Sequence, residues 1–245
     1  MPGEVIELEG DARALVAAVI HLAGYDFALI GGLAVMVRLQ EAHRVTGDLD
    51  GVFDNPTDVP TTATLIAAGI ARDSPEPQRV IVLDTDVDVI DTFALPDLAA
   101  DLPDDPKDRL FVCAHRYAFE TATAVQLRAG TDSAEIKVAI PPALIATKAH
   151  ALRFATARRR ATKRSSDLYD LYRLAASHLP EIADGLAAAR WNLRGQVADA
   201  LAADLADREQ ALAVLRAAPT LAPVDSDEFL DVITDLLNQL SSPRA

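Results

Sequence analysis

The sequence predicts an α+β fold in which a mixed β-sheet domain with flanking helices is followed by an α-helical domain. Up to residue 140, short runs rich in Val, Ile and Leu alternate with segments of helical periodicity, and beyond Pro141 every apolar pattern has helical spacing. Half of the 245 residues are hydrophobic but only 5% are aromatic. Small apolar side chains favour closely packed helices over a sandwich of aromatic-rich strands.

In the first half of the chain, apolar residues recur at helical spacing in segments bounded by Gly or Pro, which predicts helices over 11–23, 33–41 and 61–71. Runs of Val, Ile and Leu predict strands between them, at 27–30, 46–53, 79–83, 87–93, 110–112, 124–127 and 136–138. The segments 79–83 and 87–93 read as the arms of a hairpin whose turn is Asp84-Thr85-Asp86.

The second half of the chain reads as helical throughout, with predicted helices at 143–161, 166–177, 182–189, 195–217 and 228–240. Pro180, Pro219 and Pro223 fall between them. We therefore expect a first domain over residues 1–140 and a helical domain over residues 141–245.

The charge balance restricts the partners of the chain. With 23 Lys and Arg against 37 Asp and Glu, the net charge is −14, the wrong sign for a protein coated with nucleic acid or anionic lipid. A polyanion would have to bind a local basic patch. Residues 148–164 contain no acid and form the one candidate, either a nucleic-acid interface or a solvated helix face: Lys148, Arg153, Arg158, Arg159, Arg160, Lys163 and Arg164.

The sequence gives no support to several other classes of protein. Cys113 is the only cysteine, which excludes an internal disulfide, and its predicted place on a strand suggests a buried small side chain. The acidic amino terminus does not read as a targeting signal and no apolar run is long enough to span a membrane, so we expect a cytoplasmic protein without membrane contact. Closely paired histidines, a serine-hydrolase elbow and a P-loop are also missing from the sequence.

Gly31-Gly32 lies where a predicted strand turns into a helix. Glycine allows backbone amides to approach a phosphate closely, and the start of a helix favours negative charge. The pair therefore indicates a phosphate site, or simply a tight turn that needs two small residues.

Asp48 and Asp50 lie two residues apart on the next predicted strand, so their side chains point to the same face, about 6.6 Å apart along the chain. Two carboxylates placed in this way can hold the metal ions of phosphoryl transfer. The alternative is a pair of acids that faces water at the edge of a sheet.

The later acidic arm offers a third carboxylate. Asp88, between Val87 and Val89, is the residue most suited to project from the middle of a strand, while Asp84 and Asp86 suit the turn. Asp91 would share a face with the valines, but a shift in register would make it the candidate instead. An EF-hand is excluded because the positions that need Gly and Glu are Val89 and Leu95.

Asp167 and Asp170 follow the basic stretch at a spacing that makes them neighbours on one helix face. Asp170 could orient a lysine or arginine of the preceding helix. A purely structural ion pair between helices explains the same pattern.

The order of these features resembles the DNA polymerase β-like nucleotidyltransferase superfamily. The matching residues are Ile30-Gly31-Gly32-Leu33-Ala34, Arg44-Val45-Thr46-Gly47-Asp48-Leu49-Asp50 and then Asp88. Together with Lys148, Lys163 and Asp167-Leu168-Tyr169-Asp170-Leu171, they resemble the AbiEii family of type IV toxins, which includes the MenT-type toxins. The resemblance covers about residues 25–175 and implies a nucleotidyltransferase-type sheet domain.

The resemblance also implies roles for single residues. Gly31 and Gly32 would hold the triphosphate of an NTP, with Arg44 and Thr46 lining the same pocket. Asp48, Asp50 and Asp88 would bind Mg²⁺. Lys148 would contact a phosphate, and Asp170 would steer it. The basic residues Arg153, Arg158, Arg159, Arg160, Lys163 and Arg164 would serve an RNA acceptor.

The expected activity is transfer of a nucleoside monophosphate from an NTP to an acceptor hydroxyl, with release of pyrophosphate. The MenT-like case implies the tRNA 3′ end as acceptor, a block of translation and growth, and a cognate antitoxin. A small molecule or a protein as acceptor remains open, as does a catalytically silent nucleotide-binding module.

Overall fold

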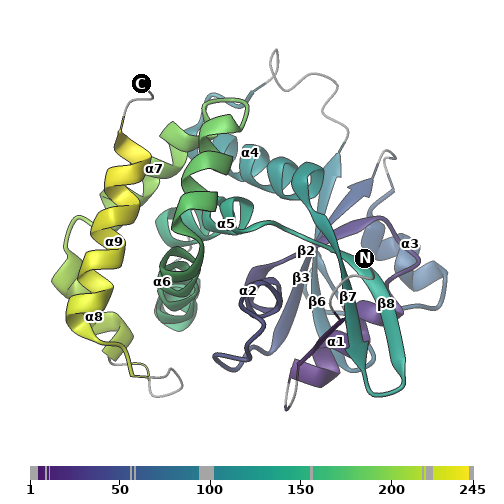
Figure 1. Cartoon of the computed structure of the whole chain (residues 1–245). Coiled ribbons are helices and arrows are strands. Elements are labelled where there is room, and N and C mark those ends of the chain that lie inside the picture. Colours follow the sequence, from purple (N-terminus) through teal and green to yellow (C-terminus); the bar gives the residue numbers. More distant parts are fainter. Residues whose placement is uncertain are drawn as a thin grey trace. The chain divides into compact units, whose positions relative to one another are not determined.

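The structure is a computed structural model that describes residues 5–8, 10, 12–55, 57, 59–93, 102–154, 157–216, 218 and 223–242, without the side chains of residue 93 and residues 157–162 (Figure 1). The chain divides into two compact units. The sheet unit comprises Met1–Asp101 and Ala118–Ile140, and the helical unit comprises Leu102–Tyr117 and Pro141–Ala245. The predicted α+β class is confirmed.

The sheet unit is built on one mixed sheet with the strand order β1-β7-β8-β2-β3-β6-β5-β4. Its central strands are β2, β3 and β6, of which β2 runs antiparallel to β3 while β3 and β6 are parallel. The bounds are β1 Val5–Glu7, β2 Phe27–Ile30, β3 Asp48–Asn55, β4 Arg72–Asp73, β5 Arg79–Val82, β6 Thr85–Phe93, β7 Thr123–Ala129 and β8 Asp132–Val138.

Among the described residues, three helices lie wholly within this unit: α1 Ala12–His21, α2 Gly31–Leu39 and α3 Thr61–Ala67. Helix α1 contacts β3, β6, β7 and β8, whereas α3 contacts β4, β5 and β6. Side chains such as Val16, Leu49, Leu65 and Val87 are fully buried in the core of this unit. Burial of such side chains contributes about 1.5–3 kcal/mol each, which fixes the register of the central strands.

The hairpin between β5 and β6 differs from the predicted one. Its turn consists of Leu83 and Asp84, both with positive φ, while Thr85 and Asp86 already belong to β6. Two-residue hairpin turns need positive φ because it matches the twist of the strands. Leucine rarely adopts that conformation, so nothing in the sequence suggested placing Leu83 in the turn. The polar residues that follow it suggested a turn at Asp84-Thr85-Asp86 instead.

The predicted strand at 110–112 is wrong, because these residues lie in helix α4, Pro106–Thr121. Pro106 occupies the first helical position, and the carboxylate of Asp105 accepts hydrogen bonds from the backbone N–H groups of Lys107 and Asp108. The buried positions recur at helical spacing: Leu110, Cys113, Ala114, Tyr117 and Ala118. Cys113 is buried as expected, on a helix rather than a strand, and burial raises the pKa of its thiol.

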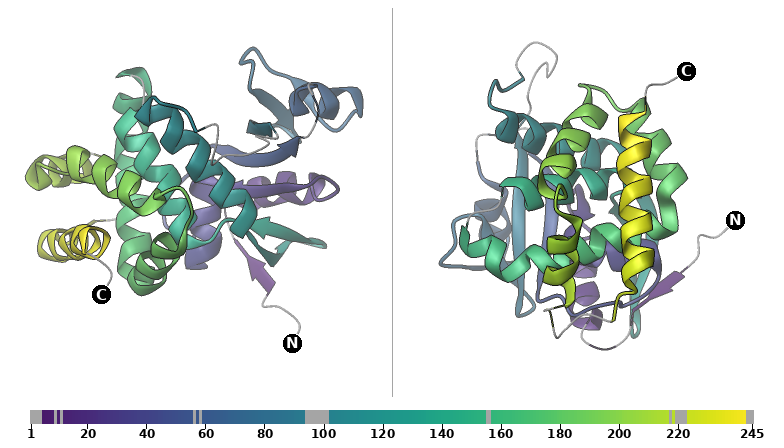
Figure 2. Two further views of the ribbon diagram at one scale, coloured as in Figure 1. Left: turned by 90° about the horizontal axis from the view of Figure 1, so that it is seen from above. Right: turned by 90° about the vertical axis from the view of Figure 1, so that its left-hand side faces the viewer.

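The helical unit contains α5 Pro141–Phe154, α6 Ala157–Ala188, α7 Leu193–Asp204, α8 Arg208–Arg216 and α9 Ser226–Ser241. Helix α6 joins two predicted helices across a kink at His178, two residues before Pro180. The predicted helix over 195–217 is instead two helices, α7 and α8, with the Asp207 carboxylate accepting a hydrogen bond from the Gln210 N–H group at the start of α8. Helix α9 packs against α6, α7 and α8, as two further views show (Figure 2).

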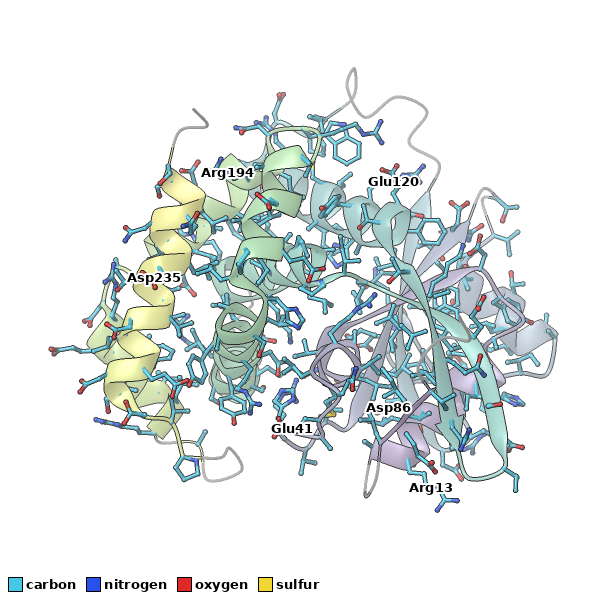
Figure 3. All side chains as sticks on the ribbon, viewed as in Figure 1. Arg13, Glu41, Asp86, Glu120, Arg194 and Asp235 are labelled. Carbon is cyan, nitrogen blue, oxygen red and sulfur yellow. The ribbon has the colours of Figure 1, made fainter. Side chains whose placement is uncertain are left out.

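Both ends of α9 are capped by hydrogen bonds to side chains of this unit. Asp225 accepts hydrogen bonds from the N–H groups of Asp227 and Glu228 at the first turn. At the last turn, the guanidinium of Arg194, labelled in Figure 3, donates to the carbonyls of Gln239, Leu240 and Ser242. In the described part of the chain, no helix combines the length and the apolar character that a membrane span requires.

Candidate active site

The pairing of β3 with β6 brings four aspartates to one face of the sheet. Asp48 lies beside Asp86 and Asp50 lies beside Asp88 on the parallel neighbour. Paired residues on adjacent strands point to the same side, and the strands are about 4.8 Å apart. We call Asp48, Asp50, Asp86 and Asp88 the aspartate cluster; Asp86 is labelled in Figure 3. The predicted turn residue Asp86 is thus part of the strand and of the cluster.

Gly31 lies against the carboxylate of Asp50. Its φ is +70°, and a Cβ at this position would overlap the Asp50 side chain. Both observations require glycine, because other residues are strained at this φ and have no room. Helix α2 begins here, and its N-cap residue Ile30 supplies no side-chain cap. The start of α2, with backbone N–H groups and the positive end of the helix dipole, is therefore placed next to Asp50.

Gly32 is equally confined, but by the two residues of the predicted phosphate pocket. A Cβ there would overlap the Arg44 guanidinium and come within 3.1 Å of the Thr46 hydroxyl oxygen. The Thr46 hydroxyl also lies 3.5 Å from Asp48 Oδ1. The structure thus brings Gly31, Gly32, Arg44 and Thr46 together with Asp48 and Asp50.

Asp88 is held by an arginine of the adjacent strand. Arg79 Nε donates to Asp88 Oδ1 at 2.6 Å and Nη2 donates to Oδ2 at 3.1 Å, while Nη1 lies 3.4 Å from Asp86 Oδ2. The hydrogen bonds to Asp88 raise the pKa of Arg79 further above its usual value, so the guanidinium remains charged. Such two-point contacts between Arg and a carboxylate are stronger and more directional than single hydrogen bonds.

Sequence reasoning missed Arg79, and the turn explains the omission. A three-residue turn at 84–86 would place Arg79 opposite Asp91, whereas the two-residue turn at Leu83 and Asp84 places it opposite Asp88. The only signal was the presence of an arginine at the start of a Val-rich strand. Without the correct turn, that residue had no partner to suggest a role.

Asp91 points away from the cluster, since it lies an odd number of residues from Asp88 on the same strand. Its Oδ2 accepts a hydrogen bond from the backbone N–H of Thr61, the first residue of α3, at 3.1 Å. Its Oδ1 is buried without a hydrogen-bond partner among the described residues. The register therefore places Asp88 beside Asp50 and gives Asp91 a contact at the start of a helix.

The aspartate cluster suits Mg²⁺ in the kind of donor it offers, because Mg²⁺ prefers carboxylate oxygens. The space that Gly31 leaves at Asp50 fits a site that must stay open beside a carboxylate. However, among the residues that the structure describes, no group of three His, Cys, Asp or Glu side chains is arranged to hold a metal ion. Arg79 contacts both oxygens of Asp88 in this arrangement.

Lys148 and Asp170 meet within the helical unit. Lys148 Nζ lies 2.8 Å from Asp170 Oδ2 and 2.6 Å from Asp167 Oδ1, and all three side chains are almost fully buried. Lys148 comes from α5, and both aspartates come from α6. Two carboxylates thus fix the ammonium group, which agrees with an orienting role for Asp170 and also with a structural ion pair.

The basic stretch does not form one uniform surface. Lys148 is buried, and Arg164 donates to the side chain of Asp204 at 2.9 Å and to its carbonyl at 3.2 Å. Arg153 is exposed at the end of α5, near the Phe154 ring. Lys163 is half-buried on α6. Arg158, Arg159 and Arg160 lie on α6, but their side chains are outside the described part of the structure.

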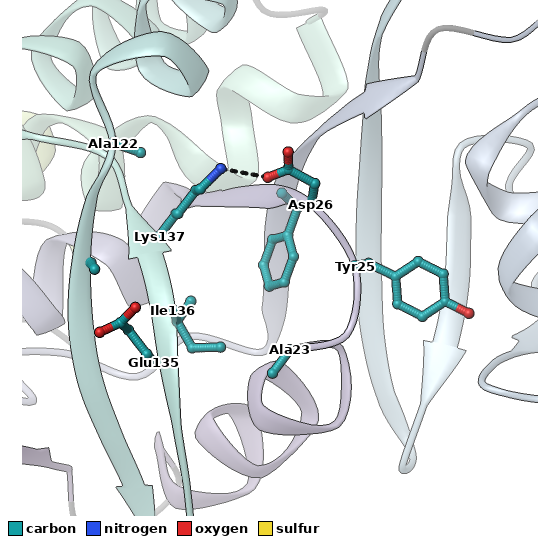
Figure 4. Close-up of a pocket in the computed structure, with 9 residues that line it drawn as sticks. Ala23, Tyr25, Asp26, Ala122, Glu135, Ile136 and Lys137 are labelled. Carbon is teal, nitrogen blue, oxygen red and sulfur yellow. Dashed lines mark hydrogen bonds and ion pairs between the residues drawn. The ribbon is translucent and has the colours of Figure 1, made fainter.

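Two pockets of the structure involve few of the predicted site residues. A pocket of about 360 Å³ in the sheet unit is lined by residues of β2, β7 and β8 and of the segments that precede β2 and β7 (Figure 4). It carries an ion pair between Lys137 Nζ and Asp26 Oδ1 at 2.6 Å. None of the predicted site residues lines it. A larger pocket of about 710 Å³ in the helical unit includes Arg153 of the basic stretch.

Comparison with known families gives this geometry a context. The model of the AbiEii nucleotidyl transferase toxin family, a type IV toxin–antitoxin system, matches residues 13–239 of the chain. The chain belongs to the AbiEii family. The resemblance noted from the glycine pair and the aspartates is therefore confirmed, and it extends beyond the residues that first carried it.

Two solved structures are similar to this AbiEii chain over most of its length. An antigenic nucleotidyltransferase-like protein from Paracoccidioides brasiliensis is similar, with 18% identity and a TM-score of 0.49, over 86% of this chain and 94% of its own. The protein JHP933 from Helicobacter pylori has 17% identity and a TM-score of 0.43, over 93% of this chain and 89% of its own. No curated protein matches the chain.

Proposed function

We propose that this AbiEii protein is a metal-dependent nucleotidyltransferase that transfers a nucleoside monophosphate from an NTP to the 3′ end of tRNA, and so blocks translation and growth. The observation that carries the proposal is the placement of Asp50 and Asp88 side by side on one face of the sheet, next to Gly31 at the start of α2. This combines acidic groups with a phosphate-binding helix start.

The transfer forms one bond and breaks another. The acceptor hydroxyl oxygen bonds to the α-phosphorus, and the bond from that phosphorus to the bridging oxygen breaks, which releases pyrophosphate. The N–H groups at the start of α2 would bind the negatively charged phosphates. Gly31 and Gly32 would allow these phosphates close approach, with Arg44 as a cationic contact and Thr46 as a hydroxyl donor.

Asp48, Asp50 and Asp88 would hold Mg²⁺. When bound, the metal would neutralise the charge that develops on the attacking and leaving oxygens. Asp88 is also the carboxylate that would accept the proton of the acceptor hydroxyl. For Lys148 we retain the role of phosphate contact that the family pattern implies, with Asp167 and Asp170 fixing its ammonium group.

The acceptor is inferred from the basic residues of the helical unit. A chain of net charge −14 can engage a polyanion only where cations are concentrated, and Arg158, Arg159 and Arg160 follow one another on α6. This favours an RNA acceptor over an uncharged small molecule. The AbiEii family is one of toxin–antitoxin systems, and we propose a cognate antitoxin as protein partner.

The proposal is tested by incubating the protein with each of the four NTPs, labelled at the α-phosphate, together with Mg²⁺ and total RNA. We expect label in RNA of tRNA length with at least one NTP, and no transfer when EDTA is present. Label in protein or in small molecules would identify a different acceptor for the same chemistry. A protein that binds NTP but transfers no label would be a silent nucleotide-binding module.

A further inference from the structure

The charge of the aspartate cluster is partly offset by a residue of the chain itself. Four carboxylates lie on two adjacent strands, and like charges at this spacing repel one another. Arg79 lies on β5, the strand next to β6, and is paired there with Asp88. Its guanidinium contacts Asp88 through two nitrogens and Asp86 through the third.

This arginine is partly buried, and so is its main partner. The side chain of Arg79 is 19% exposed and that of Asp88 is 24% exposed, so water screens their attraction less than it would at an open surface. Glu76 lies 3.5 Å from the same guanidinium and adds a further negative charge. Arg79 is therefore held from several sides.

The same contacts conflict with the role of Asp88 as a metal ligand. A carboxylate oxygen that accepts a short hydrogen bond from a guanidinium has less free lone-pair density for a cation, and the guanidinium charge itself repels that cation. Both effects act in one direction, because each lowers the affinity of the cluster for a divalent ion.

We propose that Arg79 is an internal counter-ion of Asp88 and Asp86 within the aspartate cluster, and that it must release Asp88 before a divalent cation can take this carboxylate. The inference rests on the proposed metal-dependent function. Arg79 acts through Asp88 and is therefore a positioning residue that sets the metal affinity of the site.

The test is a titration of the protein with Mn²⁺, without nucleotide, in which free Mn²⁺ is followed by electron paramagnetic resonance. For Arg79→Met we expect Mn²⁺ to bind about three- to tenfold more tightly than to the wild type, as expected for removal of a partly buried competing cation. The matched control is Arg72→Met, which removes an arginine that pairs with Asp84 at the turn of the same hairpin. Its Mn²⁺ affinity should equal that of the wild type.

A second measurement, the melting temperature, distinguishes competition between Arg79 and the metal from a general loss of order in Arg79→Met. Without metal, Arg79→Met should melt at a lower temperature than the wild type, and saturating Mg²⁺ should narrow this difference. Equal or weaker Mn²⁺ binding by Arg79→Met would overturn the inference while the proposed transfer could still be measured in the wild type. If Asp50→Asn binds Mn²⁺ as well as the wild type does, the cluster is not the metal site, and both proposals are wrong.

Discussion

Asp88 lies directly beside Asp50, on the neighbouring parallel strand and on the same face of the sheet. The two residues are far apart in the sequence, and only the β3–β6 register brings them together. Because Gly31 leaves the space next to Asp50, this face combines two carboxylates with the start of α2.

The first prediction concerns Asp48 and Asp50. Asp48→Asn and Asp50→Asn should each lower transfer by about a hundredfold or more, because each removes a charge that stabilises the transition state. Asn preserves the shape of the side chain, so the melting temperature should fall little or even rise as repulsion in the cluster is relieved. Transfer is measured with α-labelled NTP and unfolding by circular dichroism. Near-normal transfer in either variant would remove that residue from the site.

The second prediction uses two glycines of similar conformation. Gly31→Ala and Gly69→Ala both place a side chain at a φ near +70°, which costs about 1–2 kcal/mol of stability. Only at Gly31 would the new Cβ overlap Asp50, because nothing lies within 4 Å of a Cβ at Gly69. Gly31→Ala should therefore abolish transfer, and Gly69→Ala should retain it. Loss of transfer in both variants would indicate a general effect of backbone strain.

The third prediction concerns the buried ion pairs of the helical unit. Lys148→Met leaves Asp167 and Asp170 without their shared cation and should lower the free energy of unfolding by about 3–5 kcal/mol. Adding Asp170→Asn should restore part of this loss, which a double-mutant cycle in urea would measure. Lys107→Met, at an exposed position of α4, serves as the control and should change stability by less than about 0.5 kcal/mol. Additive effects of the two changes would show that Lys148 and Asp170 do not interact.

The fourth prediction separates binding of RNA from use of NTP. Replacing Arg158, Arg159 and Arg160 together by Ala should weaken tRNA binding and reduce the slope of log K against log salt by about two to three, as expected when three phosphate contacts are lost. The KM for NTP should stay near the wild-type value. Arg164→Ala is the matched control, because Arg164 pairs with Asp204 and its loss should affect stability more than the salt slope. An unchanged slope in the triple variant would exclude these arginines from the RNA interface.

Local patterns were enough to predict much of the arrangement of the candidate residues. The glycine pair lies between one strand and one helix, and the alternation of side chains along a strand puts Asp48 with Asp50 and separates Asp88 from Asp91. These relations depend on a few consecutive residues, and the structure has them as expected. The overall α+β organisation follows from the same kind of periodicity.

Relations that depend on exact turns or on longer windows were missed. Three apolar residues at 110–112 fit a strand as well as a helix, and only the cap at Asp105 and the wider spacing of buried residues identify α4. The hairpin turn includes Leu83, a residue with little turn preference, so the pairing of Arg79 with Asp88 could not be seen. The contact between Asp91 and Thr61 joins two distant segments that no local pattern connects.

The last prediction compares Asp88 with Asp91 directly. Asp88→Asn should abolish transfer because it keeps the shape and removes the charge, although the loss of the Arg79 ion pair will cost some stability. Asp91→Ala should retain transfer near the wild-type rate and lower the free energy of unfolding by about 0.5–2 kcal/mol, since the N–H of Thr61 at the start of α3 loses its acceptor.

Transfer of α-labelled NTP by these two variants, measured side by side with their melting temperatures, is the most direct test of the proposed active site. The account predicts that folded Asp88→Asn transfers no label while Asp91→Ala transfers label normally with a lowered melting temperature. An active Asp88→Asn beside an inactive but fully stable Asp91→Ala would contradict the assignment of the catalytic face to Asp48, Asp50 and Asp88.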